Sequence, residues 1–222
     1  MATDITIPLE QVSLGGELHI PQKALGLVLF AHGSGSSRHS PRNQLVARLL
    51  REARVGTLLF DLLTGAEERA EAETRHLRFN IPFLARRLVA ATRWALDQVT
   101  TADLPIGYFG SSTGAAAALV AAAELRENVQ AIVSRGGRPD LAGEALDRVE
   151  APTLLIVGGE DTTVIDLNQV AYERLHCQKA LRILPGATHL FEEPGALEKV
   201  ATMASEWFAD HLHPLTQDRP TR

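Results

Sequence analysis

Short, continuously apolar runs recur along the chain and predict strands that are buried on both faces of a sheet. They cover residues 27–30, 57–60, 106–109, 131–133 and 153–157. A half-exposed strand would instead alternate apolar and polar residues. Residues 181–184 predict a last strand, and the alternating segments 5–9 and 17–20 predict an antiparallel edge.

Segments with helical spacing of apolar residues separate these runs, at 43–53, 81–98, 113–126, 165–177 and 196–210. Alternating strands and helices require right-handed crossovers and a mostly parallel sheet. We therefore predict an α/β fold with about seven or eight strands, helices on both faces and no large cap domain. One domain is expected over residues 1–213, with a disordered polar tail at 214–222.

Composition narrows the class of function. The 222 residues are 45% hydrophobic, which suits one large α/β domain. A net charge of −5 argues against nucleic acid or an anionic membrane as partner. No apolar run approaches the roughly 18 residues of a membrane span, and the acidic start lacks the features of a signal peptide. With Cys177 as its single cysteine, the chain is expected in the cytoplasm; assembly into a homo-oligomer is left open.

The stretch Gly110-Ser111-Ser112-Thr113-Gly114 lies between a predicted strand and a predicted helix. A serine on such a sharp turn holds its hydroxyl above the edge of a parallel sheet, and glycines two residues away let strand and helix approach. The spacing selects Ser112 rather than Ser111. Because a serine hydroxyl is a weak nucleophile at neutral pH, Ser112 requires a base and a group that orients the base.

Candidates for both partners follow later strands, in the order serine, acid, histidine that this architecture uses. Asp161 follows the strand predicted at 153–157, and His189 directly follows the last strand. Glu160 and Asp166 are alternatives for the acid, although Asp166 is expected in the first turn of the next helix. The predicted catalytic residues are Ser112, Asp161 and His189.

An acyl-transfer reaction also needs donors for the developing oxyanion. The backbone amide of Thr113 stands at a helix N-terminus, and the amide of Ser34 belongs to the Gly/Ser loop at 32–37. In the same loop, His32 and Gly33 are candidates for substrate contact, and His32 is expected to hold the loop by hydrogen bonds rather than to act as base. The alternative for the loop is a flexible connector. A nucleotide site is disfavoured because the P-loop lysine and Gly-x-Gly-x-x-Gly are absent from the sequence.

Two arginines, Arg135 and Arg138, follow the strand predicted at 131–133 and face the same edge. They could bind a carboxylate or phosphate of the substrate, but pairing with nearby acids is the more common outcome. The charged segment 67–78 is either a solvated helix or loop, or a rim of the site. No metal and no cofactor are expected, because the sequence has no ligand cluster with metal-binding spacing.

These motifs resemble the α/β-hydrolase superfamily over residues 25–212, and in particular its small serine hydrolases related to dienelactone hydrolase. Residues 31–37 are similar to the oxyanion loop, 110–114 to the nucleophile elbow, 158–164 to the acid loop and 185–191 to the histidine loop. Residues 32–43 together with 61–64 further resemble a bacterial subgroup sometimes fused to a phosphoribosyltransferase domain. Dienelactone hydrolases carry cysteine as nucleophile, so Ser112 argues against dienelactone as substrate.

The resemblance implies hydrolysis of a small carboxylic ester or thioester through an acyl-enzyme on Ser112. Two alternatives remain open at this point. One is an acyltransferase that uses the same acyl-enzyme, and the other is a binding protein that keeps the fold without its chemistry.

Overall fold

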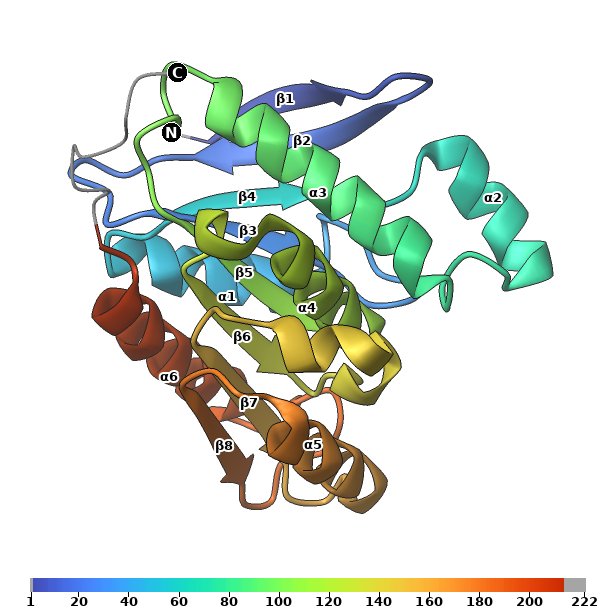
Figure 1. Ribbon diagram of the computed structural model, residues 1–222, viewed down its shortest axis with the longest axis vertical. Helices are drawn as coiled ribbons and strands as arrows, with labels where there is room; N and C mark the ends of the chain where they lie inside the picture. The colour runs from blue at the N-terminus through green and yellow to red at the C-terminus, as the bar shows by residue number, and fades with distance from the viewer. Residues whose placement is uncertain (1, 214–222) are drawn as a thin grey trace.

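Eight strands form one sheet in the computed structural model, which describes residues 2–213 (Figure 1). Their order is β1-β2-β4-β3-β5-β6-β7-β8. The strands are β1 (Thr3–Pro8), β2 (Ser13–His19), β3 (Leu27–Ala31), β4 (Gly56–Phe60), β5 (Ile106–Ser111), β6 (Ala131–Arg135), β7 (Thr153–Gly158) and β8 (Lys179–Leu184). β2 runs antiparallel to β1 and β4, and all other neighbours are parallel. The predicted mostly parallel sheet with an antiparallel edge is confirmed.

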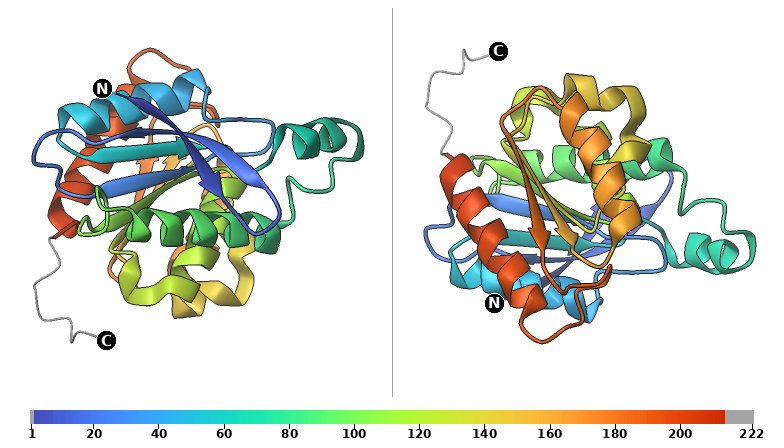
Figure 2. Two further views of the ribbon diagram at one scale, coloured as in Figure 1. Left: turned by 90° about the horizontal axis from the view of Figure 1, so that it is seen from above. Right: turned by 90° about the horizontal axis from the view of Figure 1, so that it is seen from below.

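Helices cover both faces of this sheet (Figure 2). Helices α1 and α6 pack together on one face, whereas α3, α4, α5 and the 3-10 segment η2 lie on the other. The helices are α1 (Pro41–Glu52), α2 (Gly65–Thr74), α3 (Ile81–Asp97), α4 (Thr113–Leu125), α5 (Thr162–Arg174) and α6 (Ala196–His211), with 3-10 segments η1 (Arg126–Asn128) and η2 (Pro139–Arg148).

The sheet separates two apolar cores. Along β3, Leu27 and Leu29 enter the core under α3 and α4, while Val28 and Phe30 enter the core under α1 and α6. Successive side chains of a strand point to opposite faces, so a continuously apolar strand is buried on both. This is why every residue of β3, β4 and β7 is buried.

Helix α5 starts earlier than the sequence predicts, and the charged segment takes one of the forms that the sequence left open. Helix α5 begins at Thr162 rather than at residue 165, so Asp166 lies in its second turn and not in the first. Helix α2 forms within the charged segment 67–78 and its flank, and Figure 1 shows it projecting from the body of the molecule. Its start is stabilised by a capping box, in which Thr64 and Glu67 each bond to the other's backbone amide. This excursion is small, and within residues 2–213 the sheet edge carries no large cap domain.

The tail predicted at 214–222 lies outside the described residues. Within residues 2–213, every helix is too short or too polar to cross a lipid bilayer.

Candidate active site

Ser112 sits on a strained turn between β5 and α4. Its φ of 51° and ψ of −124° are a conformation that residues with a side chain rarely adopt, and it is typical of catalytic elbows. A Cβ on Gly114 would overlap the carbonyl of Ala31, and one on Gly110 would lie 2.5 Å from the Cα of Ala115. The two glycines therefore let the helix start directly against the strands. The hydroxyl of Ser112 makes no capping bond to α4.

Asp161 and His189 are joined by a hydrogen bond of 2.5 Å from His189 Nδ1 to Asp161 Oδ2. Asp161 is the N-cap residue of α5, yet its side chain does not cap that helix. The histidine side chain is 40% exposed and the aspartate side chain 16% exposed. Of the three acids that the sequence offered, Asp161 is the one that the structure brings to the imidazole, and not Glu160 or Asp166.

Backbone hydrogen bonds hold the two loops together. The amide of Glu160 donates to the carbonyl of Ala187 at 3.0 Å, and the amide of Gly159 donates to that of Leu184 at 2.8 Å. A Cβ on Gly158 would overlap the same Ala187 carbonyl. The acid loop and the histidine loop thus form one packed unit, which fixes how the imidazole is presented.

A short segment after β6 connects this unit to Ser112. The amide of Arg138 donates to the carbonyl of Ser112 at 3.0 Å, while a Cβ on Gly136 would lie 3.0 Å from the carbonyl of His189. Within residues 2–213, no hydrogen bond joins the Ser112 hydroxyl to the His189 imidazole. Catalytic hydrogen bonds of this kind often tighten only when substrate is bound.

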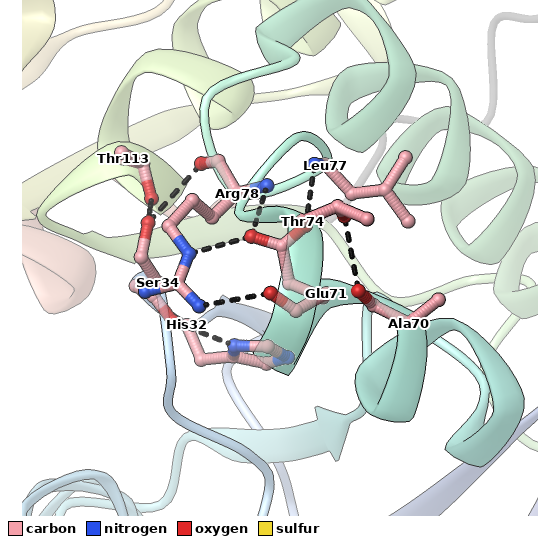
Figure 3. Close-up of polar contacts among 9 residues, drawn as sticks. His32, Ser34, Ala70, Glu71, Thr74, Leu77, Arg78 and Thr113 are labelled. Atoms are coloured by element: carbon pink, nitrogen blue, oxygen red, sulfur yellow. Dashed lines mark hydrogen bonds and ion pairs between the residues drawn. The ribbon is translucent and has the colours of Figure 1, made fainter.

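The loop after β3 passes directly beside Ser112, since a Cβ on Gly33 would lie 2.9 Å from the Cβ of Ser112. Ser34 Oγ donates to the carbonyl of Arg78 at 3.1 Å and lies 3.0 Å from Thr113 Oγ1 (Figure 3). Because Ser34 has one hydroxyl proton, Thr113 is the donor to Ser34. Neither the Ser34 amide nor the Thr113 amide donates to another group of the described chain. Both amides are thus available to an oxyanion.

His32 ties the same loop to the end of β4. The amide of Leu62 donates to His32 Nε2 at 2.9 Å, so the ring proton is on Nδ1, which donates to the carbonyl of Gly33 at 3.0 Å. The side chain is 5% exposed, and burial lowers its pKa despite the opposing hydrogen bond to Gly33. His32 is therefore a neutral, structural imidazole with both nitrogens occupied.

Glu71 and Arg78 extend this network into the segment around α2, as Figure 3 shows. The Glu71 carboxylate is 2% exposed and accepts hydrogen bonds from the amide of Leu77 at 2.5 Å, the amide of Arg78 at 3.2 Å and Arg78 Nε at 2.5 Å. Burial alone would raise the pKa of Glu71, but these hydrogen bonds hold that pKa below its usual range. Glu71 thereby fixes Arg78, whose carbonyl accepts from Ser34.

Sequence reasoning missed Glu71 and Arg78 as residues of the site. They belong to a run of charged residues whose pattern does not distinguish a buried acid from the exposed ones around it. The only available signal was the position of the segment after a strand end, which made it a candidate rim.

Arg135, the last residue of β6, and Arg138, three residues further along, have different surroundings. Arg138 makes a bidentate ion pair with Asp140, at 2.9 Å and 2.7 Å. Arg135 is 7% exposed, lies with its guanidinium carbon 5.9 Å from the Phe191 ring, and has two buried nitrogens, Nε and Nη1, without a partner. Burial and then the nearby charge of Arg42 lower its pKa to about 10.

Metal ligands are not gathered in this region. Among residues 2–213, no three histidine, cysteine, aspartate or glutamate side chains converge on a common point. The expectation that the protein uses neither a metal nor a cofactor stays a prediction.

Solved structures share the fold of this chain. The chain is 58% identical to a dienelactone hydrolase from Anabaena variabilis, with a TM-score of 0.94 over 96% of this chain and 99% of that one. It also superposes on Est1E from Butyrivibrio proteoclasticus with a TM-score of 0.76, over 93% and 98% of the two chains, at 17% identity. The second likeness concerns the fold alone.

Two curated proteins from strains of Mycobacterium tuberculosis, each named a putative phosphoribosyl transferase, are 56% identical over 209 residues. This stretch is 94% of the present chain and 46% of each relative, so the chain spans about half the length of the curated relatives it matches. The predicted resemblance to a subgroup linked with phosphoribosyltransferases is confirmed. The model of the alpha/beta hydrolase domain matches residues 24–212, and the chain therefore belongs to that family of hydrolases.

Proposed function

We propose that the protein hydrolyses small carboxylic esters or thioesters through an acyl-enzyme on Ser112, with His189 as general base and Asp161 orienting it. The observation that carries the proposal is the 2.5 Å hydrogen bond between Asp161 and His189, in loops packed beside a serine on a strained elbow. Such a bond fixes the imidazole tautomer that leaves Nε2 free to accept a proton.

In the proposed reaction, His189 Nε2 takes the hydroxyl proton as Ser112 Oγ attacks the carbonyl carbon. The carbonyl oxygen becomes an oxyanion, and the amides of Ser34 and Thr113 donate to it. The bond to the leaving alcohol or thiol then breaks, and that group takes the proton from His189. Water, activated by the same imidazole, attacks the acyl-enzyme, releases the carboxylic acid and restores the Ser112 hydroxyl.

The substrate is proposed to be a small molecule that enters from solvent. The His189 side chain is 40% exposed, and the described residues supply no large cap over the sheet edge. The cytoplasm as the place of action, and the exclusion of nucleic acid and membrane as partners, are proposals from composition. Phosphoribosyl transfer is not proposed, because the hydrolase domain accounts for residues 24–212, nearly all that the chain shares with the relatives so named.

The test is turnover of p-nitrophenyl acetate by purified variants. Ser112→Ala should lose at least about 10³-fold in kcat, since the nucleophile is gone. Ser111→Ala, the matched control one residue earlier, should keep most of its rate. A fluorophosphonate probe should label the wild-type protein and fail to label His189→Ala. Retained turnover in Ser112→Ala, or no labelling of the wild type, would refute the proposal.

The acyltransferase alternative shares every step up to the acyl-enzyme. Product analysis with alcohols and amines competing against water separates the two reactions. Acid as the main product supports hydrolysis, whereas predominant transfer to an acceptor would replace it.

A further inference from the structure

In the described part of the chain, every arginine that is half-buried or buried pairs with a carboxylate, with a single exception. The ion pairs are Arg38–Asp61, Arg42–Glu192, Arg51–Glu17, Arg78–Glu71, Arg87–Glu67, Arg138–Asp140 and Arg174–Asp147. The exception is Arg135, which is also the most buried arginine of residues 2–213, at 7% exposed. Carboxylates are abundant in this chain, so the unpaired state of Arg135 calls for a cause.

The Arg135 guanidinium is a charged group with unmet hydrogen-bonding capacity. Its Nε and Nη1 atoms are buried and have no partner among the described residues. Although burial lowers its pKa to about 10, the group remains protonated at neutral pH. A buried cation with unpaired donors and no counter-charge is unfavourable, and native proteins resolve such groups with a counter-charge or a bound ligand.

A neighbouring charge adds to the unfavourable electrostatics of Arg135, because it is another cation. Arg42 acts on Arg135 electrostatically, and its own Nε is buried without a partner. Among residues 2–213, its one carboxylate partner is Glu192, which accepts from Arg42 Nη1 at 2.9 Å and has a side chain that is 62% exposed. Arg42 stands in the first turn of α1. This turn contains no acidic residue, and the N-cap residue Ser40 makes no side-chain capping bond. The positive end of this helix is therefore uncompensated as well.

These groups adjoin the proposed catalytic residues. Arg135 ends β6 and is the register partner of Ser111 on β5, the residue before the nucleophile. A Cβ on Gly136, the next residue, would lie 3.0 Å from the His189 carbonyl oxygen, and the centroid of the Phe191 ring in the histidine loop lies 5.9 Å from the Arg135 guanidinium carbon. An anion held here would sit between the nucleophile elbow, the histidine loop and the start of α1.

We propose that Arg135 and Arg42 form a binding site for an oxyanion, a carboxylate or phosphate group, beside the nucleophile elbow. The guanidinium fork presents parallel donors that match the oxygens of either group, and a charge-assisted pair supplies the missing partner. The oxyanion is either an acidic group of the substrate or a free anion. Binding of the anion is independent of the proposed hydrolysis; only its assignment to the substrate rests on that function.

Phosphate is the first probe, and thermal unfolding is the readout. At saturating phosphate, about 100 times the dissociation constant, the unfolding midpoint of the wild type should rise by about 5–10 °C relative to chloride at equal ionic strength. Arg135→Met should lose this increment, and Arg42→Met should reduce it. Arg93→Met is the matched control, because Arg93 pairs with Glu124 at an exposed site between α3 and α4. It should respond as the wild type does.

Phosphate also stabilises proteins without binding to them. The decisive quantity is therefore the difference in the midpoint increment between the wild type and its variants. Equal increments in the wild type, Arg135→Met and Arg42→Met would overturn the proposal. Without phosphate, Arg135→Met should be at least as stable as the wild type, because replacing an unpaired buried charge by an apolar side chain removes its desolvation cost. If Arg135→Met does not fold, Arg42→Met alone decides, since its half-exposed side chain tolerates the change.

A pair of substrates distinguishes the two sources of the anion. The ratio of kcat/KM for mono-p-nitrophenyl succinate to that for p-nitrophenyl acetate should fall by about tenfold or more in Arg135→Met if the substrate supplies the carboxylate. An unchanged ratio together with the phosphate increment assigns the site to a free anion. Failure of the proposed function itself would appear as retained turnover in Ser112→Ala, which leaves the phosphate measurement untouched.

Discussion

A single buried imidazole shapes the loop that is proposed to hold the oxyanion. His32 accepts from the Leu62 amide through one nitrogen and donates to the Gly33 carbonyl through the other. The bond from Leu62 requires the neutral ring, because a proton on Nε2 would face the amide proton of Leu62. The position of Gly33, and with it that of Ser34, therefore depends on the protonation state of a residue outside the proposed triad.

The free energy of unfolding should depend on pH through His32. Burial lowers the pKa of His32 in the folded protein, so between that value and the unfolded value of about 6.5 the unfolded chain binds more protons. The contribution of His32 to stability is thus complete above about pH 7 and is lost as pH falls below about 6.5, by up to about 1.4 kcal/mol per pH unit. Urea unfolding of the wild type and His32→Gln between pH 5 and 8 measures it, and the variant should show the shallower slope.

His19 serves as control, because it is the other histidine whose pKa is lowered, by burial and then by Arg51. His19→Gln should remove a dependence of the unfolding free energy on pH that has the same sign, while the contribution of His32 persists. If the wild type and His32→Gln lose stability in parallel as pH falls, the neutral assignment of His32 is wrong.

Residue-scale prediction from sequence works where order along the chain carries the information. Ser112, Asp161 and His189 each follow a strand end, and parallel strands bring their carboxyl ends to one edge. Order along the chain does not predict the partner of an arginine side chain. Whether Arg135 meets an acid depends on side chains of α1 and the histidine loop, far away in sequence, so the paired and unpaired outcomes looked alike until the structure was known.

At the scale of elements, helix α2 supports the loop that carries Ser34. Its buried acid, Glu71, fixes the backbone of Leu77 and Arg78, and the Arg78 carbonyl receives the Ser34 hydroxyl. Thr113 then donates to Ser34, so both proposed oxyanion residues are connected to α2. Helix α2 should therefore influence catalysis although none of its residues belongs to the proposed triad.

Glu71→Gln tests this role for α2. The amide keeps the shape of the side chain but removes its charge and presents donors where Leu77 and Arg78 also donate, so the Ser34 loop should lose its fixed position. Oxyanion donors act mainly in the transition state, so kcat should fall by about tenfold or more while KM changes little. Steady-state kinetics with p-nitrophenyl acetate provide both values.

Glu73→Gln is the matched control, since Glu73 is an exposed acid of the same helix. It should leave kcat and KM as in the wild type. A rise in KM with unchanged kcat in Glu71→Gln would instead mean that α2 supports substrate binding. No change in either value would mean that α2 does not position the loop.

Elements with an apolar pattern could be predicted from sequence, and elements held by local polar contacts could not. The buried strands and α1, α3, α4 and α6 carry apolar faces that set their location. Helix α2 buries mainly Glu71 and is stabilised by its capping box, which gives no hydrophobic period. The start of α5 was misplaced because Asp161, its N-cap residue, bonds to His189 instead of the helix.

At the scale of the whole molecule, the proposed chemistry and much of the packing lie toward different ends of the strands. The proposed catalytic residues lie in loops beyond the carboxyl ends, whereas the core under α1 and α6 extends from Ala187 and Phe191 of the histidine loop to Phe208 of α6. Phe208 of α6 is fully buried in that core and fits against Gly107, where a Cβ would lie 2.9 Å from Phe208 Cε1. Gly107 is near the amino end of β5, whereas Ser112 follows its carboxyl end.

Phe208→Ala should therefore separate stability from activity. Removing a fully buried phenyl ring leaves a cavity between α6 and β5 and should cost about 3–5 kcal/mol of unfolding free energy, measured by urea denaturation. The fraction that remains folded should hydrolyse p-nitrophenyl acetate with kcat/KM within about twofold of the wild type, because distant sites without shared partners act independently. Phe208→Leu, which fills part of the cavity, should lie between the two in stability and match the wild type in activity. A loss of kcat/KM in the folded protein that follows the loss of stability across this series would show that the α1/α6 core positions the catalytic loops, and that the two roles are not separate.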